Sequence, residues 1–125
     1  MKNYIHFFII APLIWLAACN KKADQIKSFI PGTYTNFAKG AYAQANDTLV
    51  ITLVKDNTFL ITRNTTYQAI REGSLLPKHR QVKLLNAIYD SQNQVLDETT
   101  NGRIIKFDPG KRLLKVNQAV YKKIN

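Results

Sequence analysis

Hydrophobic and polar side chains alternate along much of this chain with the period of two that is typical of a half-buried β-strand. The clearest example lies between residues 48 and 62, where two alternating segments flank the polar run Lys55-Asp56-Asn57. This pattern predicts a hairpin with a three-residue loop and with Val54 opposite Thr58. The buried side then fixes the register, and the expected partners are Leu53 with Phe59, Ile51 with Ile61, and Leu49 with Arg63.

The C-terminal third predicts a second hairpin, because Asn101-Gly102 is the preferred two-residue turn in which both residues tolerate positive φ. Counting outward from this turn gives one face that is mostly apolar and another that carries an opposite-charge pair. The expected partners are Thr100 with Arg103, Glu98 with Ile105, Asp97 with Lys106, and Leu96 with Phe107.

Two further turns continue the same apolar face. Asp108-Pro109-Gly110-Lys111 predicts a type II turn, since Pro fixes φ at the second position and Gly accepts positive φ at the third. That turn would place Leu114 opposite Ile105 and Val116 opposite Arg103. A last tight turn near Asn117 and Gln118 returns residues 119–124 and brings Tyr121 opposite Leu114.

Apart from the first hairpin, the segment between residues 23 and 95 contains only short runs that indicate secondary structure. Residues 23–29 predict one helical turn that Pro31-Gly32 ends, and Gly32-Thr33-Tyr34 begins a strand. Residues 73–79 contain Pro77 and predict a loop. The other expected strands are a short one at residues 67–70 and a longer one at residues 82–89, which turns at Ser91-Gln92-Asn93 into Val95.

Together these elements predict an all-β fold, an antiparallel meander of seven to eight short strands. Closing the meander hides both of its edges, so we expect a closed or nearly closed barrel in which the Tyr34 strand pairs with the Tyr121 strand. An open, strongly bent sheet and a two-sheet sandwich are the alternatives. The expected domain covers residues 31–125.

The N-terminus follows a different pattern, with a short polar and basic region before an apolar run from Phe7 to Ala18. This run has 12 residues, whereas a bilayer-spanning helix needs about 20, and Pro12 interrupts it. Residues 1–18 therefore predict a secretory signal peptide that is removed, rather than a membrane span.

The end of this signal, Leu16-Ala17-Ala18-Cys19, resembles the lipobox of bacterial lipoproteins. The resemblance implies cleavage between Ala18 and Cys19, a diacylglycerol thioether on the Cys19 sulfur, and an acyl chain on the new amino group. Cysteine is required because its thiolate is the nucleophile that takes the lipid, and several acyl chains make a permanent anchor. Residues 19–30 would form the lipidated tether. Asn20, in place of Asp, resembles lipoproteins of the outer membrane that face the periplasm.

The charge of the chain indicates anionic surroundings. It has 18 Lys and Arg against 8 Asp and Glu, a formal net charge of +10, which attracts anionic surfaces or partners at long range. Cys19 is the only cysteine, so the domain has no disulfide framework and depends on packing.

Catalytic motifs are missing from the sequence. His79 lies between Lys78 and Arg80, with no acidic residue near it in sequence to orient it. No run of His, Cys, Asp and Glu has the spacing of a metal site, and the glycines form no phosphate-binding loop. We therefore expect no enzyme, no metal and no cofactor apart from the covalent lipid.

Two groups of charged residues are candidate binding sites. Arg63, Glu98 and Arg103 share the face that would line a barrel, where they would bind the head of a small anionic or amphipathic ligand. The alternative is that Glu98 and Arg103 pair with each other at the rim. The second candidate is a basic patch, either a binding surface or a solvated face; because no exposed aromatic platform accompanies it, we do not expect nucleic acid. Its residues are Lys78, Arg80 and Lys83 with Lys111, Arg112 and Lys115.

Two resemblances bear on function. The Pro31-Gly32-Thr33-Tyr34 start and the C-terminal strand around Tyr121 are similar to small lipocalin-like lipoproteins, and the whole layout resembles uncharacterised lipoproteins that accompany conjugative elements. They imply a barrel and a non-enzymatic binding or accessory role in an envelope assembly. The alternatives are a carrier of a small ligand inside the barrel and an inhibitor of a cell-wall lytic enzyme.

Overall fold

The computed structural model describes residues 22–125, so the signal peptide, Cys19 and the first tether residues lie outside the described part. Residues 22–29 form a helix, longer than the single turn expected for residues 23–29. Nine strands follow: β1 (Gly32–Lys39), β2 (Ala43–Lys55), β3 (Thr58–Arg71), β4 (Ser74–Leu75), β5 (His79–Asp90), β6 (Val95–Glu98), β7 (Arg103–Asp108), β8 (Leu113–Val116) and β9 (Ala119–Lys123).

Eight of these strands close into an antiparallel barrel, while β4 pairs only with the end of β3. The order around the barrel is β2-β1-β9-β8-β7-β6-β5-β3, and the β2–β3 pairing completes the circle. Closure joins β1 to β9 as expected, through Tyr34 opposite Lys123. The all-β meander and the closed barrel are confirmed, and the open sheet and the sandwich are not formed.

In the predicted alternation, every second side chain of a strand is large and apolar and points toward the barrel interior. Each such side chain that is removed from water contributes about 1.5–3 kcal/mol before entropy is counted. The interior therefore forms one hydrophobic core, whose most deeply buried strand residues are Tyr34, Ile51, Phe59, Ile61, Ala87, Leu96 and Leu114.

The N-terminal helix covers one end of the barrel. Its Ile26 and the following Ile30 belong to the core, and the Tyr34 hydroxyl donates to the carbonyls of Phe29 and Ile30, each at 2.9 Å. The chain turns into β1 at Gly32, where φ is +151° and an added Cβ would collide with the Asn125 carbonyl oxygen. Only glycine fits this position, which explains why Pro31-Gly32 ends the helix.

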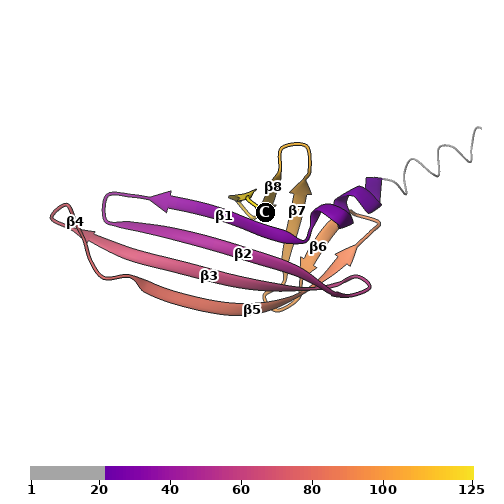
Figure 1. The fold of residues 1–125 in the computed structure, drawn as a ribbon, viewed down its shortest axis with the longest axis horizontal. Helices are drawn as coiled ribbons and strands as arrows, with labels where there is room; N and C mark the ends of the chain where they lie inside the picture. Colours follow the sequence, from indigo (N-terminus) through magenta and orange to yellow (C-terminus); the bar gives the residue numbers. More distant parts are fainter. Residues whose placement is uncertain (1–21) are drawn as a thin grey trace, which may run out of the picture.

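Three strands are much longer than the sequence predicts. β2, β3 and β5 have 13, 14 and 12 residues, and with the end of β1 they continue past the barrel as an open four-stranded sheet (Figure 1). We call this extension the arm and define it as residues 36–47 and 63–84. Figure 1 places its tip at the far side of the molecule from the helix.

The lengthening of these strands changes two predicted elements. Residues 67–70 are the last part of β3 rather than a separate short strand. The expected loop at residues 73–79 contains β4, which pairs Ser74 with Arg71 and Leu75 with Ile70. Both segments lie at the tip of the arm.

The first hairpin has the predicted register over most of its length. Leu53 lies opposite Phe59, Ile51 opposite Ile61, and Leu49 opposite Arg63. The predicted pair of Val54 and Thr58 is wrong, because Lys55 faces Thr58 and the register shifts between Leu53 and Lys55. The loop is a two-residue turn at Asp56-Asn57, with Asp56 at φ 49°, and Val54 is the extra residue of a bulge.

The register predicted for the second hairpin is wrong by two residues, since Glu98 lies opposite Arg103 and Leu96 opposite Ile105. The turn takes four residues because Thr99 is held by β5, where its backbone N–H and its hydroxyl both donate to the Asn86 carbonyl. The Glu98 carboxylate accepts from the Asn101 N–H at 2.9 Å and closes the turn. A shift of two keeps every side chain on its predicted face.

The third hairpin is also shifted by two, with Phe107 opposite Leu114 and Ile105 opposite Val116. The predicted type II turn is wrong, because Arg112 at φ 55° occupies the left-handed region and Gly110 does not. The final turn is confirmed, with Asn117 at φ 53° and Tyr121 opposite Leu114.

Candidate functional site

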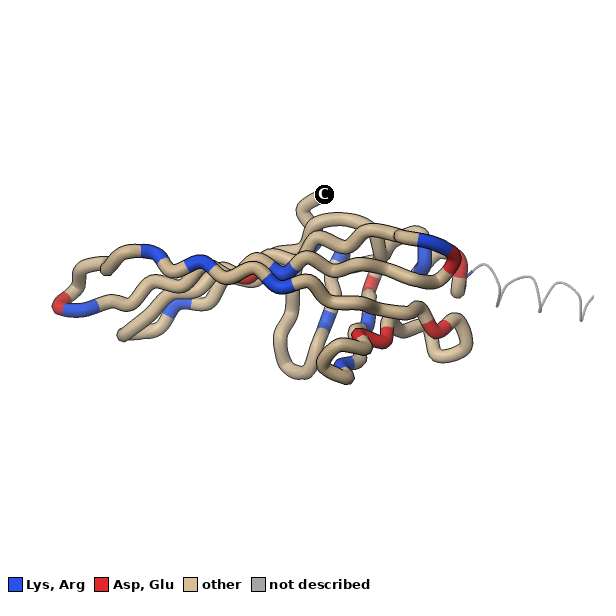
Figure 2. Tube along the Cα trace, turned by 90° about the horizontal axis from the view of Figure 1, so that it is seen from below, with Lys and Arg blue, Asp and Glu red and all other residues tan. Residues whose placement is uncertain are grey.

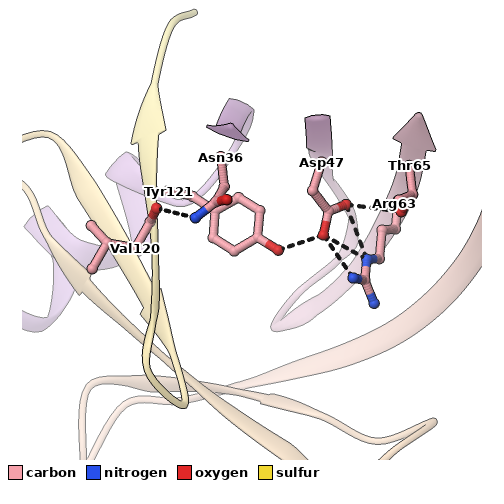
Figure 3. A network of polar contacts seen from close by, with 6 residues as sticks. All are labelled: Asn36, Asp47, Arg63, Thr65, Val120 and Tyr121. Atoms are coloured by element: carbon pink, nitrogen blue, oxygen red, sulfur yellow. Dashed lines mark hydrogen bonds and ion pairs between the residues drawn. The ribbon is translucent and has the colours of Figure 1, made fainter. Parts of the chain in front are cut away.

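Asp47 is the centre of a polar network at the point where the arm leaves the barrel (Figure 3). Arg63 on β3 donates to its carboxylate from Nε at 3.0 Å and from Nη2 at 2.7 Å. The Thr65 hydroxyl donates to the same carboxylate at 3.1 Å, and the Tyr121 hydroxyl of β9 donates at 2.7 Å. One carboxylate thus joins β2, β3 and β9, and its acceptor positions are already occupied by the protein.

The network holds its groups in fixed protonation states. The Asp47 and Arg63 side chains are only 13% and 27% exposed. Burial raises the pKa of Asp47, but the hydrogen bonds from Arg63 and Tyr121 outweigh burial and hold it below 3.8. The hydrogen bond to Asp47 raises the pKa of Arg63, and burial followed by the bond to Asp47 raises that of Tyr121. We therefore assign this network to positioning the arm rather than to binding a ligand.

The structure brings the three predicted interior residues Arg63, Glu98 and Arg103 to the wall of one small cavity. Glu98 is 2% exposed, and among residues 22–125 its Oε2 has no hydrogen-bond partner. The alternative of an ion pair between Glu98 and Arg103 is not formed, since the ion pair found in the described part joins Arg63 to Asp47. Asp47 was missed because the predicted hairpin stops at residue 48; the same register continued by two residues places Asp47 opposite Thr65, next to Arg63.

The volume of this cavity decides how it can be used. It is about 20 Å³, enough for one water molecule. The rest of the interior is filled by side chains of the core or packed against it, among them Phe59, Leu96, Tyr121 and Phe107. This space is too small for an amphipathic ligand.

The two predicted basic clusters lie on different parts of the molecule. Lys78, Arg80 and Lys83 belong to the arm, whereas the cluster of Lys111, Arg112 and Lys115 lies on the β7–β8 turn and on β8. Two strands, β6 and β7, separate β5 from β8 in the sheet. The structure therefore does not form a single basic patch from all six residues.

The arm exposes apolar side chains that the sequence did not identify as surface residues. Phe37 is 62% exposed, Tyr42 83%, Val82 54% and Leu84 64%. Phe37 also shares a shallow hollow of about 240 Å³ with Lys78, lined otherwise by Gln44, Ala45, Asn46, Thr66 and Gln68. One exposed aromatic side chain, that of Phe37, therefore lies beside a residue of the basic cluster.

The arm carries an excess of positive charge on a short part of the chain (Figure 2). The arm has two acidic residues, Asp47 and Glu72, and Asp47 is paired with Arg63. Its basic residues outnumber them: Lys39, Arg63, Arg71, Lys78, Arg80 and Lys83. The arm is therefore a cationic projection with apolar side chains between its charges.

Residues 22–125 give little support for a metal site or for a membrane-spanning helix. Within that range no three His, Cys, Asp or Glu side chains are grouped to hold a metal ion. No helix there has both the length and the apolar content needed to cross a bilayer. Comparison with protein families, with curated proteins and with solved structures finds no match for this chain.

Proposed function

We propose that this chain is a lipid-anchored cell-envelope protein whose barrel supports the arm as a binding surface for a partner protein. The observation that carries the proposal is the arm itself. A four-stranded sheet with apolar side chains exposed between cations projects from a barrel whose interior is filled. Large apolar side chains gathered on one exposed part of a protein are typical of interaction sites.

The position of the arm fits an anchor at Cys19. Cys19 precedes the N-terminal helix by three residues in sequence, and the tip of the arm lies at the opposite side of the molecule from that helix (Figure 1). A chain held by lipid at Cys19 would direct its helical end to the membrane. The arm would then reach away from that membrane, toward proteins of the periplasm or of an envelope assembly.

Partner binding accounts for the exposed residues better than transport of a ligand. A carrier needs an interior space, and the cavity beside Arg63 and Arg103 is about 20 Å³. An accessory role in an assembly, as the resemblance to lipoproteins of conjugative elements implies, needs only an accessible surface. The arm supplies that surface, and its positive charge favours an acidic partner.

The lipid anchor is tested by growing cells that express the full chain with labelled palmitate. We expect label in the wild-type protein and none in Cys19→Ser, which should also be lost from the membrane fraction. Equal labelling of both proteins would contradict the assignment of Cys19.

The binding surface is tested by purifying the native lipoprotein from detergent extracts of the envelope. We expect a stoichiometric partner protein that is lost from the arm variant Phe37→Ser with Leu84→Ser. The control carries Val54→Ser with Ile104→Ser, two exposed residues of the barrel strands and of similar exposure. Loss of the partner from both variants, or from the control alone, would place the binding surface elsewhere.

A further inference from the structure

The arm has a long strand edge with no partner. β5 pairs with β3 from His79 to Ile88 but with β6 only from Ala87 to Asp90. All six side chains from His79 to Leu84 are exposed, and this stretch contains neither proline nor glycine. Natural proteins commonly cover or interrupt such edges, because a free edge pairs with other chains.

The hydrogen-bonding direction of this edge follows from its last paired residue. The Asn86 N–H donates to the Thr100 hydroxyl, and its carbonyl accepts from the Thr99 N–H at 2.9 Å, so both backbone groups face the β6 side. Backbone direction alternates along an antiparallel strand. The N–H and C=O groups of Arg80, Val82 and Leu84 therefore face the open edge, where an added strand would meet them.

The side chains along this edge have a definite chemical pattern. Arg80, Val82 and Leu84 lie on the outer face of the sheet, and His79, Gln81 and Lys83 lie on the face that continues the barrel interior. A second copy of the chain would bring a second set of the same cations to this edge, which is unfavourable. An extended segment with carboxylates near these cations and apolar side chains beside Val82 and Leu84 has the complementary pattern.

We propose that the edge of β5 from His79 to Leu84 binds an extended, acidic segment of a partner protein as an additional strand. This proposal rests on the proposed function and names the partner's chemistry and its mode of binding. Backbone hydrogen bonds would supply the affinity and the alternating side chains the specificity, as in other cases of strand addition. The cations at Arg80 and Lys83 then have a double role, since they oppose self-association and attract the acidic strand.

The first test uses the mature protein and a synthetic peptide as long as residues 79–85, with glutamate at the positions opposite Arg80 and Lys83 and valine at those opposite Val82 and Leu84. We expect the peptide to slow amide exchange at Arg80, Val82 and Leu84, whose N–H groups face the edge. The control peptide has the same sequence with alternate backbone nitrogens methylated, so that it keeps its charge but cannot pair. Equal binding of both peptides would overturn strand addition and indicate attraction to any anionic chain.

The second test changes the edge itself. Val82→Pro removes one outward N–H without breaking a bond to β3, a position where proline is tolerated. We expect it to weaken peptide binding about tenfold, whereas Val82→Thr, which keeps the N–H, changes binding little. If Val82→Pro unfolds the arm, charge reversal gives the same test. Lys83→Glu should weaken peptide binding, whereas Lys115→Glu, an exposed control on the barrel, should not. Equal effects of the two variants in either pair would overturn the proposal.

Purification from the envelope separates this proposal from the proposed function. Loss of the partner protein from Phe37→Ser with Leu84→Ser but not from Val82→Pro would leave the arm as a binding surface and refute strand addition. Retention of the partner in both variants would refute both proposals. Self-association of the wild-type protein that Val82→Pro abolishes would identify a second copy as the occupant and overturn the acidic segment.

Discussion

The barrel and the arm are made from the same strands, yet they bury their side chains very differently. In the barrel, inner-face residues of β3 such as Phe59 and Ile61 are inaccessible to solvent. Further along the same face of β3, Tyr67 is 44% exposed, because within residues 22–125 the sheet does not close over that face in the arm. The alternation of side chains continues through both parts, but a hydrophobic core accompanies it only where the sheet closes.

This difference separates the source of stability from the surface available for recognition. The barrel holds the buried apolar residues that drive folding. The arm is held by the backbone hydrogen bonds of its hairpins and by the Asp47 network at its base, which links it to β9. Elements with few buried contacts open locally at a lower free energy than the core, so we expect the arm to tolerate substitutions that the barrel does not.

The largest expected effect comes from truncating matched phenylalanines in the two parts. Phe59→Ala in the barrel should lower the free energy of unfolding by about 3–5 kcal/mol, because it leaves a cavity in the core. Phe37→Ala in the arm should change it by less than about 0.5 kcal/mol, as exposed substitutions do. Urea denaturation of both variants measures the difference. Similar losses would mean that the arm contributes to the core.

The next largest effect should come from the junction. Asp47→Ala leaves Arg63 and the Tyr121 hydroxyl without their acceptor in a partly buried site, which should cost about 1–3 kcal/mol. The same change should speed amide exchange in the arm more than in β6 and β7. Uniformly faster exchange in all strands would show that Asp47 supports the whole barrel rather than the arm.

The stability supplied by Asp47 should depend on pH. Because hydrogen bonds hold the folded pKa of Asp47 below its ordinary value of 3.8, this contribution is complete above that value and is lost as the pH falls through the folded pKa. Thermal unfolding of wild type and Asp47→Asn should therefore differ most near neutral pH and converge in acid. A difference that grows with acidification would contradict this assignment.

The smallest expected effect is at the tip of the arm. Tyr42 is 83% exposed, so Tyr42→Ser should leave the free energy of unfolding unchanged within about 0.5 kcal/mol. Denaturant unfolding checks this, with Tyr34→Phe as the sensitive control, because that change removes the buried hydroxyl that donates to Phe29 and Ile30. A large loss for Tyr42→Ser would show that the tip is packed in solution.

The barrel was predictable because its strands alternate and its turns have recognisable residues. The hairpin registers near Asn101 and Pro109 were missed by two residues, since turn length is set there by side-chain bonds such as that from the Asn101 N–H to Glu98. Such bonds join residues only after the strands are placed. The face of each residue survived the error, because the shift was even.

The arm and the Asp47 network could not be found in the same way. On the arm's inner face, small or polar residues such as Ala45 and Thr65 replace the apolar residues that mark a buried strand. Asp47 is 16 residues from Arg63 and 74 from Tyr121 in sequence, and three paired strands bring them together. Local patterns therefore predicted the part of the sheet that has a core and missed the part without one.

The central claim is that the arm, and not the barrel surface, contacts a partner protein. Photocrosslinking in intact cells tests it most directly, with p-benzoyl-phenylalanine introduced at Phe37 of the arm or at Ile104 of the barrel, two exposed positions. We predict a discrete crosslinked protein from position 37 and none from position 104. Crosslinks only from position 104, or equally from both, would contradict the account.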